Sequence, residues 1–475
     1  MAAETLRQAV SAAVERFPEI HAAQHRREAV RAQAGQARAE LFPSISGSLG
    51  EGRERSRNVS TRAFGDDVTL RRREAELSVT QLLFDGGAAG GQVRGFSARA
   101  EGAEFTVVST IEEVALRAGQ TFLQVGRLQE QFVIARENVG IHERTLSDVN
   151  ALAQAGRGRR ADVTQAQARR ALATSSAEQL AGQLAQAESD FRHLTGRVPG
   201  ELAPPPSFEP ELPPREEHAV SHALAAHPVV RAAEKEVEAA QHDRESARAR
   251  LAMPRVTIEA GASRNRDIDG ITGPNHDRYA MLRLRYNFFR GFGDSERVRE
   301  TEARMEEALA GLARVRTEIE RDVRQAWDAL VSDRTRLPQL AQYARASADV
   351  AEAYRLQFQL GQRSLLDVLN AENERYNAVS TYIAARAAVA ADELRLLATQ
   401  GRLLEALGVS PPAGSSRPDE APASARPEGP AGPRAEPQPA CEGVAAGHGP
   451  CLVLRLDSRL PDGYGLEAPL SSRSR

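Results

Sequence analysis

An internal duplication is the feature that most constrains this chain. Residues 156–170 read GRGRRADVTQAQARR and residues 361–375 read GQRSLLDVLNAENER; in both, an Asp-Val pair begins six residues after the first glycine. The same offset of 205 residues relates the triplets Phe84–Gly86 and Phe289–Gly291. A unit that recurs at a fixed offset folds into the same substructure each time. The fold is therefore expected to contain two copies of one plan.

Each copy is predicted to open with a helix and two strands. The helices span about residues 5–40 and 216–251, and each stops before a proline. Alternating apolar and polar residues then predict strand pairs, separated by polar loops at residues 51–67 and 263–277. The strand segments are residues 44–49, 74–83, 256–262 and 280–288. This alternation fits a soluble sheet with one wet face, and it also fits a membrane barrel with apolar residues toward lipid.

A long helical hairpin is predicted after the strands of each copy. We assign its strand-to-helix turns and its hairpin-tip turns to four glycines, Gly86 and Gly291 for the former and Gly156 and Gly361 for the latter. The 70 residues between these turns would reach roughly 105 Å as one continuous helix. Return helices should run to about Leu194 and Leu407. We expect a break or kink at Pro338, inside the second descending helix.

Proline content divides the chain into four parts. Residues 1–198 form the first repeat and residues 216–409 the second, and the proline-rich segment 199–215 reads as an extended linker between them. Residues 410–475 are rich in Pro, Ala and Gly, and we expect a disordered tail there. Within that tail only the short apolar run at residues 451–456 suggests a local strand.

Composition excludes several classes of function. The net charge is −3, so nothing indicates a nucleic-acid partner. Aromatic residues make up 5% of the chain, and the apolar content comes mainly from Ala, Leu and Val, which suits long, closely packed helices. We expect no membrane-spanning helix and, from the opening MAAETLRQAV, no signal peptide. Both cysteines, Cys441 and Cys451, lie in the tail, so the body has no disulfide or metal framework.

The repeated segments resemble the TolC family of outer-membrane channel proteins of Gram-negative bacteria. The resemblance covers about residues 4–410 and rests on motifs that recur in order across the duplication. These motifs are ELFPSIS at residues 40–46 with its echo LAMPRVTIEAG at 251–261, SVTQLLFDGG at 78–87, FRHLTG at 191–196, LRYNFFRGFG at 284–293 and FQLGQRSLLDVLNAENERYNA at 358–378.

This resemblance implies a specific architecture. The chain would be mainly α-helical with four β-strands, and three copies would form a 12-stranded outer-membrane β-barrel continued by a periplasmic α-helical barrel. The implied location is the outer membrane, in contact with its lipid and extending into the periplasm. Four strands alone have open edges, which lipid does not tolerate, so a homotrimer would close them.

The resemblance also implies a gate at the periplasmic tip. By position in the family's motif, Phe358, Arg363 and Asp367 match the gate segment in the second repeat, and Asp162 matches the gate acid in the first. Arg363 and Asp367 are four residues apart, so they can pair within or between chains. Family members often carry a second acid three residues later, where this chain has Asn370, so we expect a less charged acidic ring and no strong cation block. The spacing alone also fits solvated charges on a helix surface.

Other motifs receive structural interpretations. The glycines at residues 86–91 lack the GxxxxGK[ST] pattern of a phosphate-binding loop. The arginines at residues 157–160 have no interleaved aromatics, so a solvated tip or an adaptor contact is favoured over nucleic acid. His218 and His222 have the spacing of a metal pair but no accompanying HExxH motif. We therefore predict no catalytic residues, no metal, no cofactor and no enzymatic activity.

Two functions fit an outer-membrane duct of this kind. One is passive exit of a protein toxin in type I secretion, with an inner-membrane ABC transporter and a periplasmic adaptor (membrane fusion) protein. The other is tripartite drug or metal efflux with a proton-driven pump. The LFDGG turn and the absence of a lipidated N-terminal Cys favour secretion. A soluble helical scaffold is a third hypothesis, which the missing signal peptide supports.

Overall fold

The computed structural model describes residues 3–65 and 67–412, and the statements below concern these residues. The expectations for the tail beyond residue 412, including Cys441, Cys451 and the strand at 451–456, lie outside the described residues. No helix of the described part has both the length and the hydropathy needed to cross a membrane.

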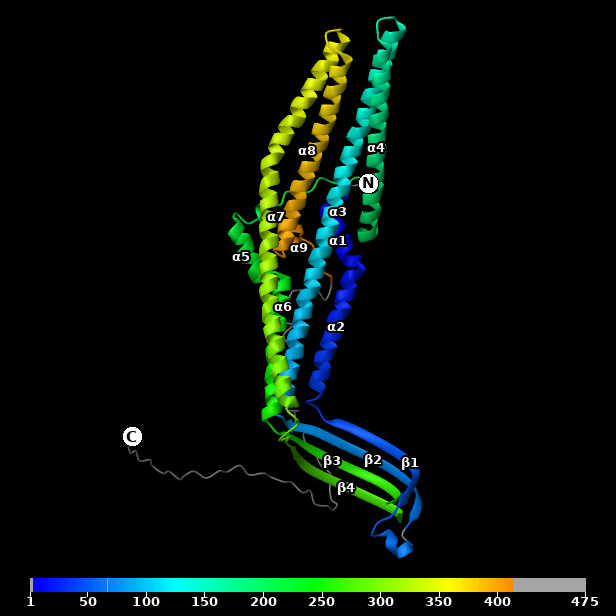
Figure 1. The fold of residues 1–475 in the computed structure, drawn as a ribbon, viewed down its shortest axis with the longest axis vertical. Coiled ribbons are helices and arrows are strands. Elements are labelled where there is room, and N and C mark those ends of the chain that lie inside the picture. The colour runs from blue at the N-terminus through cyan, green and yellow to red at the C-terminus, as the bar shows by residue number, and fades with distance from the viewer. Residues whose placement is uncertain (1–2, 66, 413–475) are drawn as a thin grey trace, which may run out of the picture. The chain divides into compact units, whose positions relative to one another are not determined.

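The described chain contains two copies of one series of elements (Figure 1). The first series is α1 (Leu6–Arg16), α2 (Pro18–Ala39), β1 (Ser44–Ser56), β2 (Val68–Phe84), α3 (Ala88–Gln154) and α4 (Arg160–Thr195). The second series is α5 (Glu216–Ala226), α6 (Pro228–Ala252), β3 (Arg255–Ile268), β4 (Ile271–Arg285), α7 (Gly293–Gln359), α8 (Leu365–Thr399) and α9 (Leu403–Leu407). Two short 3-10 helices, η1 (Thr61–Phe64) and η2 (Glu209–Glu211), complete the described part.

The opening helix of each copy is interrupted by a proline, so the prediction of one unbroken helix is wrong at both places. α1 ends at Arg16, the next residue Phe17 is extended with a φ of −70° and a ψ of 125°, and α2 begins at Pro18. α5 and α6 meet in the same way at His227 and Pro228. Proline lacks an N–H and disfavours helical backbone in the residue before it, so each pair turns the chain and restarts a helix.

The two descending helices are equal in length and uninterrupted. α3 and α7 each have 67 residues, which corresponds to roughly 100 Å of helix. A break at Pro338 is not found, because α7 is helical through this residue; Figure 1 shows α7 bending toward its upper end. A proline whose flanking turns pack against a neighbour bends a helix without ending it. The second return helix stops at Thr399, since Gly401 (φ 67°) breaks the predicted run to Leu407 and sets α9 apart.

The strands form one antiparallel sheet in the order β1-β2-β3-β4, at the end of α3 and α7 away from the hairpin tips (Figure 1). The strands have 13, 17, 14 and 15 residues, so the loops predicted at 51–67 and 263–277 are too long. Polar residues there pair across the ladder and do not form loops. Glu51 lies opposite Arg73 and forms an ion pair with it at 3.1 Å.

The two faces of the sheet differ in chemistry. One face carries apolar side chains from all four strands, and these are exposed in the single chain: Ile45, Leu49, Leu77, Leu83, Ile258, Leu282 and Leu284. The opposite face is mostly polar, with serine, threonine and charged side chains alternating along the same strands. β1 and β4 are the sheet's edges, and no other strand of the described residues lies beyond them.

The main hydrophobic core lies midway along the helices, where α1, α3, α4, α8 and α9 meet. Phe122 and Phe191 are its largest fully buried aromatic side chains, and the rest is mainly Ala, Val and Leu. The proline-rich segment 199–215 packs onto this core through Phe208, which is 3% exposed. The backbone N–H of Phe208 donates to Glu393 Oε2 at 3.3 Å. The buried Phe208 ring and this hydrogen bond therefore hold the linker segment against the core.

Candidate functional site

The two hairpin tips share one turn geometry. Gly156 and Gly361 each have a φ of 75°, a left-handed conformation that glycine adopts without strain. In the first tip the N–H of Gly156 donates to Ala153 O, and the N–H of the next residue reaches back to Leu152 O; the second tip repeats both bonds. This is the Schellman pattern, which satisfies the last carbonyls of a helix. The strand-to-helix turns also use left-handed glycines, Gly86 at 72° and Gly291 at 59°.

An apolar cluster joins the two hairpins just behind these turns. Val149 of α3 packs with Leu365 and Leu369 of α8, and all three are buried. Val163 of α4 and Phe358 of α7 pack against the same cluster and are partly buried. Phe358, predicted as a gate residue, therefore contacts a cluster to which all four long helices contribute. Any separation of the hairpins at the tips has to expose this cluster.

Arg363 is held mainly by α7. Its guanidinium lies 4.0 Å from the ring centroid of Tyr354, and its Nε donates to Gln357 Oε1 at 3.0 Å. The predicted pair with Asp367 is longer, 4.0 Å between Nη1 and Oδ2, with both side chains partly exposed. Arg363 also precedes Ser364, the N-cap of α8, so it lies in the turn and not on the helix. Such an exposed pair contributes only about 0–1 kcal/mol.

The two predicted acids lie at helix N-termini. Asp367 lies in the first turn of α8, where its N–H donates to Ser364 Oγ at 3.2 Å and its carboxylate accepts from the same hydroxyl at 2.8 Å. Asp162 lies in the first turn of α4, and its N–H donates to Arg159 O at 3.1 Å. Negative charge is stabilised at this end of a helix. The favourable position of negative charge at a helix N-terminus is therefore enough to explain both carboxylates.

Asn370 takes part in a contact that crosses between the hairpins. Arg169 of α4 donates from Nη2 to Asn370 Oδ1 of α8 at 3.2 Å. Sequence reasoning did not identify Arg169, because one arginine among several on an exposed helix face has no distinguishing pattern. The position matters because the bond joins the first repeat to the second next to the tip.

Buried polar side chains continue this seam between α3 and α8. His142 is 4% exposed and Glu372 is 3% exposed, and Arg375 Nε donates to Glu372 Oε2 at 2.9 Å. Burial lowers the pKa of His142 below 6.5; Glu372 opposes this shift, while Arg169 and Arg375 reinforce it. Further along the seam, Gln131 donates to Ser380 O at 3.1 Å. Buried groups of this kind fix how two helices align.

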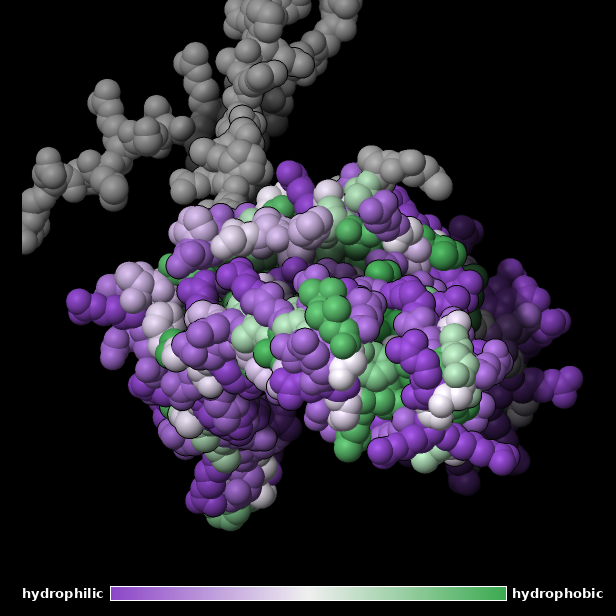
Figure 2. All heavy atoms as spheres, turned by 90° about the horizontal axis from the view of Figure 1, so that it is seen from above, coloured by the Kyte–Doolittle hydropathy of each residue, from purple (hydrophilic) through white to green (hydrophobic). Residues whose placement is uncertain are grey.

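The tip surface is mainly polar, although Leu360 and Leu366 of the second tip are 73% and 48% exposed. Figure 2, which looks down on the tips, shows mostly hydrophilic side chains with apolar residues scattered among them. Within residues 3–65 and 67–412, no three His, Cys, Asp or Glu side chains are grouped closely enough to hold a metal ion. The tips therefore present polar and charged groups around a packed apolar cluster.

Comparison with known proteins finds similarity over most of the described chain. A family model described as outer membrane efflux protein matches residues 9–197 and 219–402. Outer membrane efflux protein BepC of Brucella suis biovar 1 is 23% identical over 372 residues, which cover 77% of this chain and 78% of BepC. Protein CyaE of Bordetella pertussis is 27% identical over 320 residues, 66% of each chain. The Campylobacter jejuni CmeC outer membrane channel superposes with a TM-score of 0.75 at 14% identity, over 84% of this chain and 86% of CmeC.

Proposed function

Because this chain belongs to the outer membrane efflux protein family, we propose that three copies assemble into an outer-membrane exit duct that moves cargo passively. The observation that carries this proposal is a sheet with one apolar face and two open edges, continued by helices of 67 residues. Unpaired edges are costly in lipid, and closure by other copies removes them. Three copies of four strands give a barrel of 12, and the helices reach roughly 100 Å beyond it.

Exposed aromatic side chains support a membrane boundary where the strands meet the helices. Phe42 and Phe84 are 68% and 49% exposed at the helix-proximal ends of β1 and β2. Phe288, Phe289 and Phe292 follow β4 and are at least 70% exposed. Aromatic rings are enriched at the level of lipid headgroups. We infer that the inner surface of the outer membrane lies at this junction, with the helices in the periplasm.

We further propose that the tips form the gate of the duct. Asp162, Phe358, Arg363, Asp367 and Asn370 would control its width, with the apolar tip cluster holding the hairpins together in the closed state. The bond between Asn370 and Arg169 joins the two hairpins and is a contact that opening would break. A periplasmic adaptor and an inner-membrane transporter would supply the energy, because a passive duct has no energy source of its own.

Type I secretion of a protein remains our first candidate for the transport route, with an ABC transporter as the inner-membrane partner. Its support is the LFDGG turn at residues 83–87, in which Gly86 and Gly87 both have positive φ. Tripartite drug or metal efflux with a proton-driven pump is the second candidate, favoured by the description of the family and by the name of BepC. Deleting the gene and measuring both a secreted acidic protein and the minimal inhibitory concentrations of drugs separates the two routes.

The assembly itself is tested by fractionation and electrophoresis. We expect the protein to require detergent for extraction, to migrate as a trimer until it is boiled, and to form channels in planar bilayers. A monomer recovered in the aqueous fraction would contradict the duct and return the chain to the scaffold hypothesis.

A further inference from the structure

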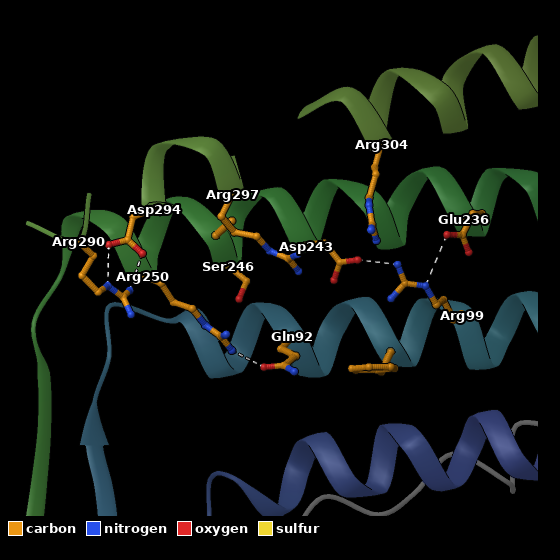
Figure 3. A pocket seen from close by; sticks show the side chains of 12 residues that line it. Gln92, Arg99, Glu236, Asp243, Ser246, Arg250, Arg290, Asp294, Arg297 and Arg304 are labelled. Atoms are coloured by element: carbon orange, nitrogen blue, oxygen red, sulfur yellow. Dashed lines mark hydrogen bonds and ion pairs between the residues drawn. The ribbon is translucent and has the colours of Figure 1, made fainter. Parts of the chain in front are cut away.

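Two adjoining cavities lie where the sheet meets the helices. The larger, about 640 Å³, lies among α3, α6 and α7 (Figure 3). The smaller, about 410 Å³, lies between these helices and the ends of β3 and β4. Arg250 and Arg290 line both cavities, so the two adjoin, and together they are called the recess below. Nothing in the gate or in strand closure requires this recess.

The larger cavity is lined by charges that largely neutralise one another. Figure 3 shows Arg99 directed at Asp243 and Arg290 at Asp294, with ion-pair distances of 2.5 and 2.9 Å. The remaining arginines of α7 in this cavity share Glu300, at 2.7 Å each. Arg250 differs, because its recorded partner is the neutral side chain of Gln92, at 2.5 Å.

The smaller cavity has an excess of positive charge. Arg250, Arg255 and Arg285 line it, and within the described ranges none of the three has a carboxylate at ion-pair distance. Arg255 and Arg285 are direct cross-strand partners, an arrangement of like charges that is destabilising by itself. Two acids, Glu40 and Asp85, also line the cavity, so its four arginines outnumber them, and Asp85 accepts from the N–H groups of Gly87 and Ala89 at 3.0 and 2.7 Å.

The excess charge lies on a defined side of the molecule. Arg255 and Arg285 alternate with the apolar residues of β3 and β4, so they belong to the polar face of the sheet. The recess therefore continues that polar face onto α6 and α7. The first repeat does not reproduce this charge: at the offset of 205 residues, Thr80 occupies the position of Arg285.

We propose that Arg250, Arg255 and Arg285 form a basic collar inside the duct, which binds polyvalent oxyanions, carboxylates or phosphates, as they pass. The proposal rests on the proposed function, since three copies that turn their apolar faces to lipid enclose their polar faces. Guanidinium groups match carboxylate and phosphate geometry through paired N–H donors. A ring of unpaired cations in a narrow passage concentrates anions. The source of the oxyanion is either an acidic polypeptide or a free polyphosphate.

The test compares two triple variants in planar bilayers. The collar variant is Arg250→Gln, Arg255→Gln, Arg285→Gln. The control variant is Arg248→Gln, Arg314→Gln, Arg321→Gln, which removes three ion-paired arginines of α6 and α7 that line neither cavity. Hexaglutamate and inorganic tripolyphosphate are each added on the sheet side, from which the collar is reached without crossing the gate.

We expect at least one probe to block the wild-type and control channels, and its blocking concentration for these two should be about tenfold lower than for the collar variant. Block by hexaglutamate alone identifies acidic polypeptide as the source, and block by tripolyphosphate alone identifies polyphosphate. Equal potency on all three proteins, for both probes, overturns the collar. Raising the KCl concentration should weaken the block, because salt screens exposed charges.

A binding measurement separates the collar from the duct. If the wild-type protein forms no trimer and no channel, the proposed function fails, and the collar is then tested by calorimetric titration of both probes into detergent-solubilised protein. Weaker binding to the collar variant than to the control supports the oxyanion site, and equal binding overturns it. Circular dichroism of all three proteins establishes that the substitutions leave the fold intact.

Discussion

The ion pair predicted between Arg363 and Asp367 is not the shortest side-chain contact of Arg363. The residue was identified by its position in the family's motif, and its spacing predicted a pair with Asp367, yet its shorter contacts are with Tyr354 and Gln357 of α7. The double substitution Arg363→Ala, Asp367→Ala removes these contacts, which all lie within the second hairpin, and one positive and one negative charge of its tip. We expect single-channel conductance in planar bilayers to rise severalfold, because shorter side chains widen the proposed constriction and the α7–α8 turn is held less firmly.

The first repeat offers a matched control for this experiment. Arg157→Ala removes a charge from the other tip without touching the α7–α8 turn, and we expect unchanged conductance. Equal conductance of the double variant and the wild type would remove Arg363 and Asp367 from the gate.

His142 predicts how the seam between α3 and α8 responds to acid. Because burial lowers its pKa below 6.5, His142 binds a proton less readily in the folded chain than in the unfolded chain as the pH falls below 6.5. The free energy of unfolding should therefore fall as the pH drops below about 6.5. The variant His142→Gln, which cannot titrate there, should lose less of its thermal midpoint between about pH 7.5 and 5.5 than the wild type does.

An exposed histidine provides the comparison. His218 lies on the surface of α5, so His218→Gln should keep the pH dependence of the wild type. The idea fails if the two variants respond to acid alike.

Among the elements, α3 and α6 are brought close by glycines on α3. A Cβ at Gly95 would lie 3.3 Å from the carbonyl oxygen of Ala239 and 2.9 Å from Asp243 Oδ1. Gly95→Leu should push the helices apart and lower the free energy of unfolding by about 1–3 kcal/mol. Gly311→Leu on α7 is the control, since nothing lies within 4 Å of its Cβ position, and it should be neutral or stabilising by up to about 1 kcal/mol. Chemical unfolding followed by circular dichroism measures both.

The elements that sequence predicted best are those whose signals are local. Alternation identified the four strands, and the repeated glycines identified turns that bound the two 67-residue helices. The interruptions at Pro18 and Pro228 were missed because proline is also a normal first residue of a helix. Strand lengths were underestimated because residues such as Glu51 look like loop residues until their partners across the ladder are known.

The candidate site was less predictable for a related reason. Family position pointed to Arg363 and Asp367, but Tyr354 and Arg169 entered only through contacts between helices. Their sequence neighbourhoods do not distinguish them from other exposed positions. A contact that depends on how two long helices align cannot be found from one helix alone.

For the whole molecule, the two faces of the sheet make the clearest prediction. Leu282 is 67% exposed on the apolar face, and its neighbour Met281 is 41% exposed on the other. Leu282→Arg should reduce insertion into the outer membrane at a cost of about 2 kcal/mol, whereas Met281→Arg should be tolerated. The measure is the fraction of protein recovered from the membrane as heat-sensitive trimer. Equal recovery of the two variants would mean that the apolar face does not meet lipid.

The open edges β1 and β4 have a genetic consequence. In a closed ring each copy offers β4 to the β1 of the next, so a chain damaged in one edge strand still binds a neighbour through the other edge. In a cell that makes normal and damaged chains in equal amounts, only about one trimer in eight is built from normal chains alone. A mutation in an edge strand should therefore be dominant, whereas one that prevents folding altogether should be recessive.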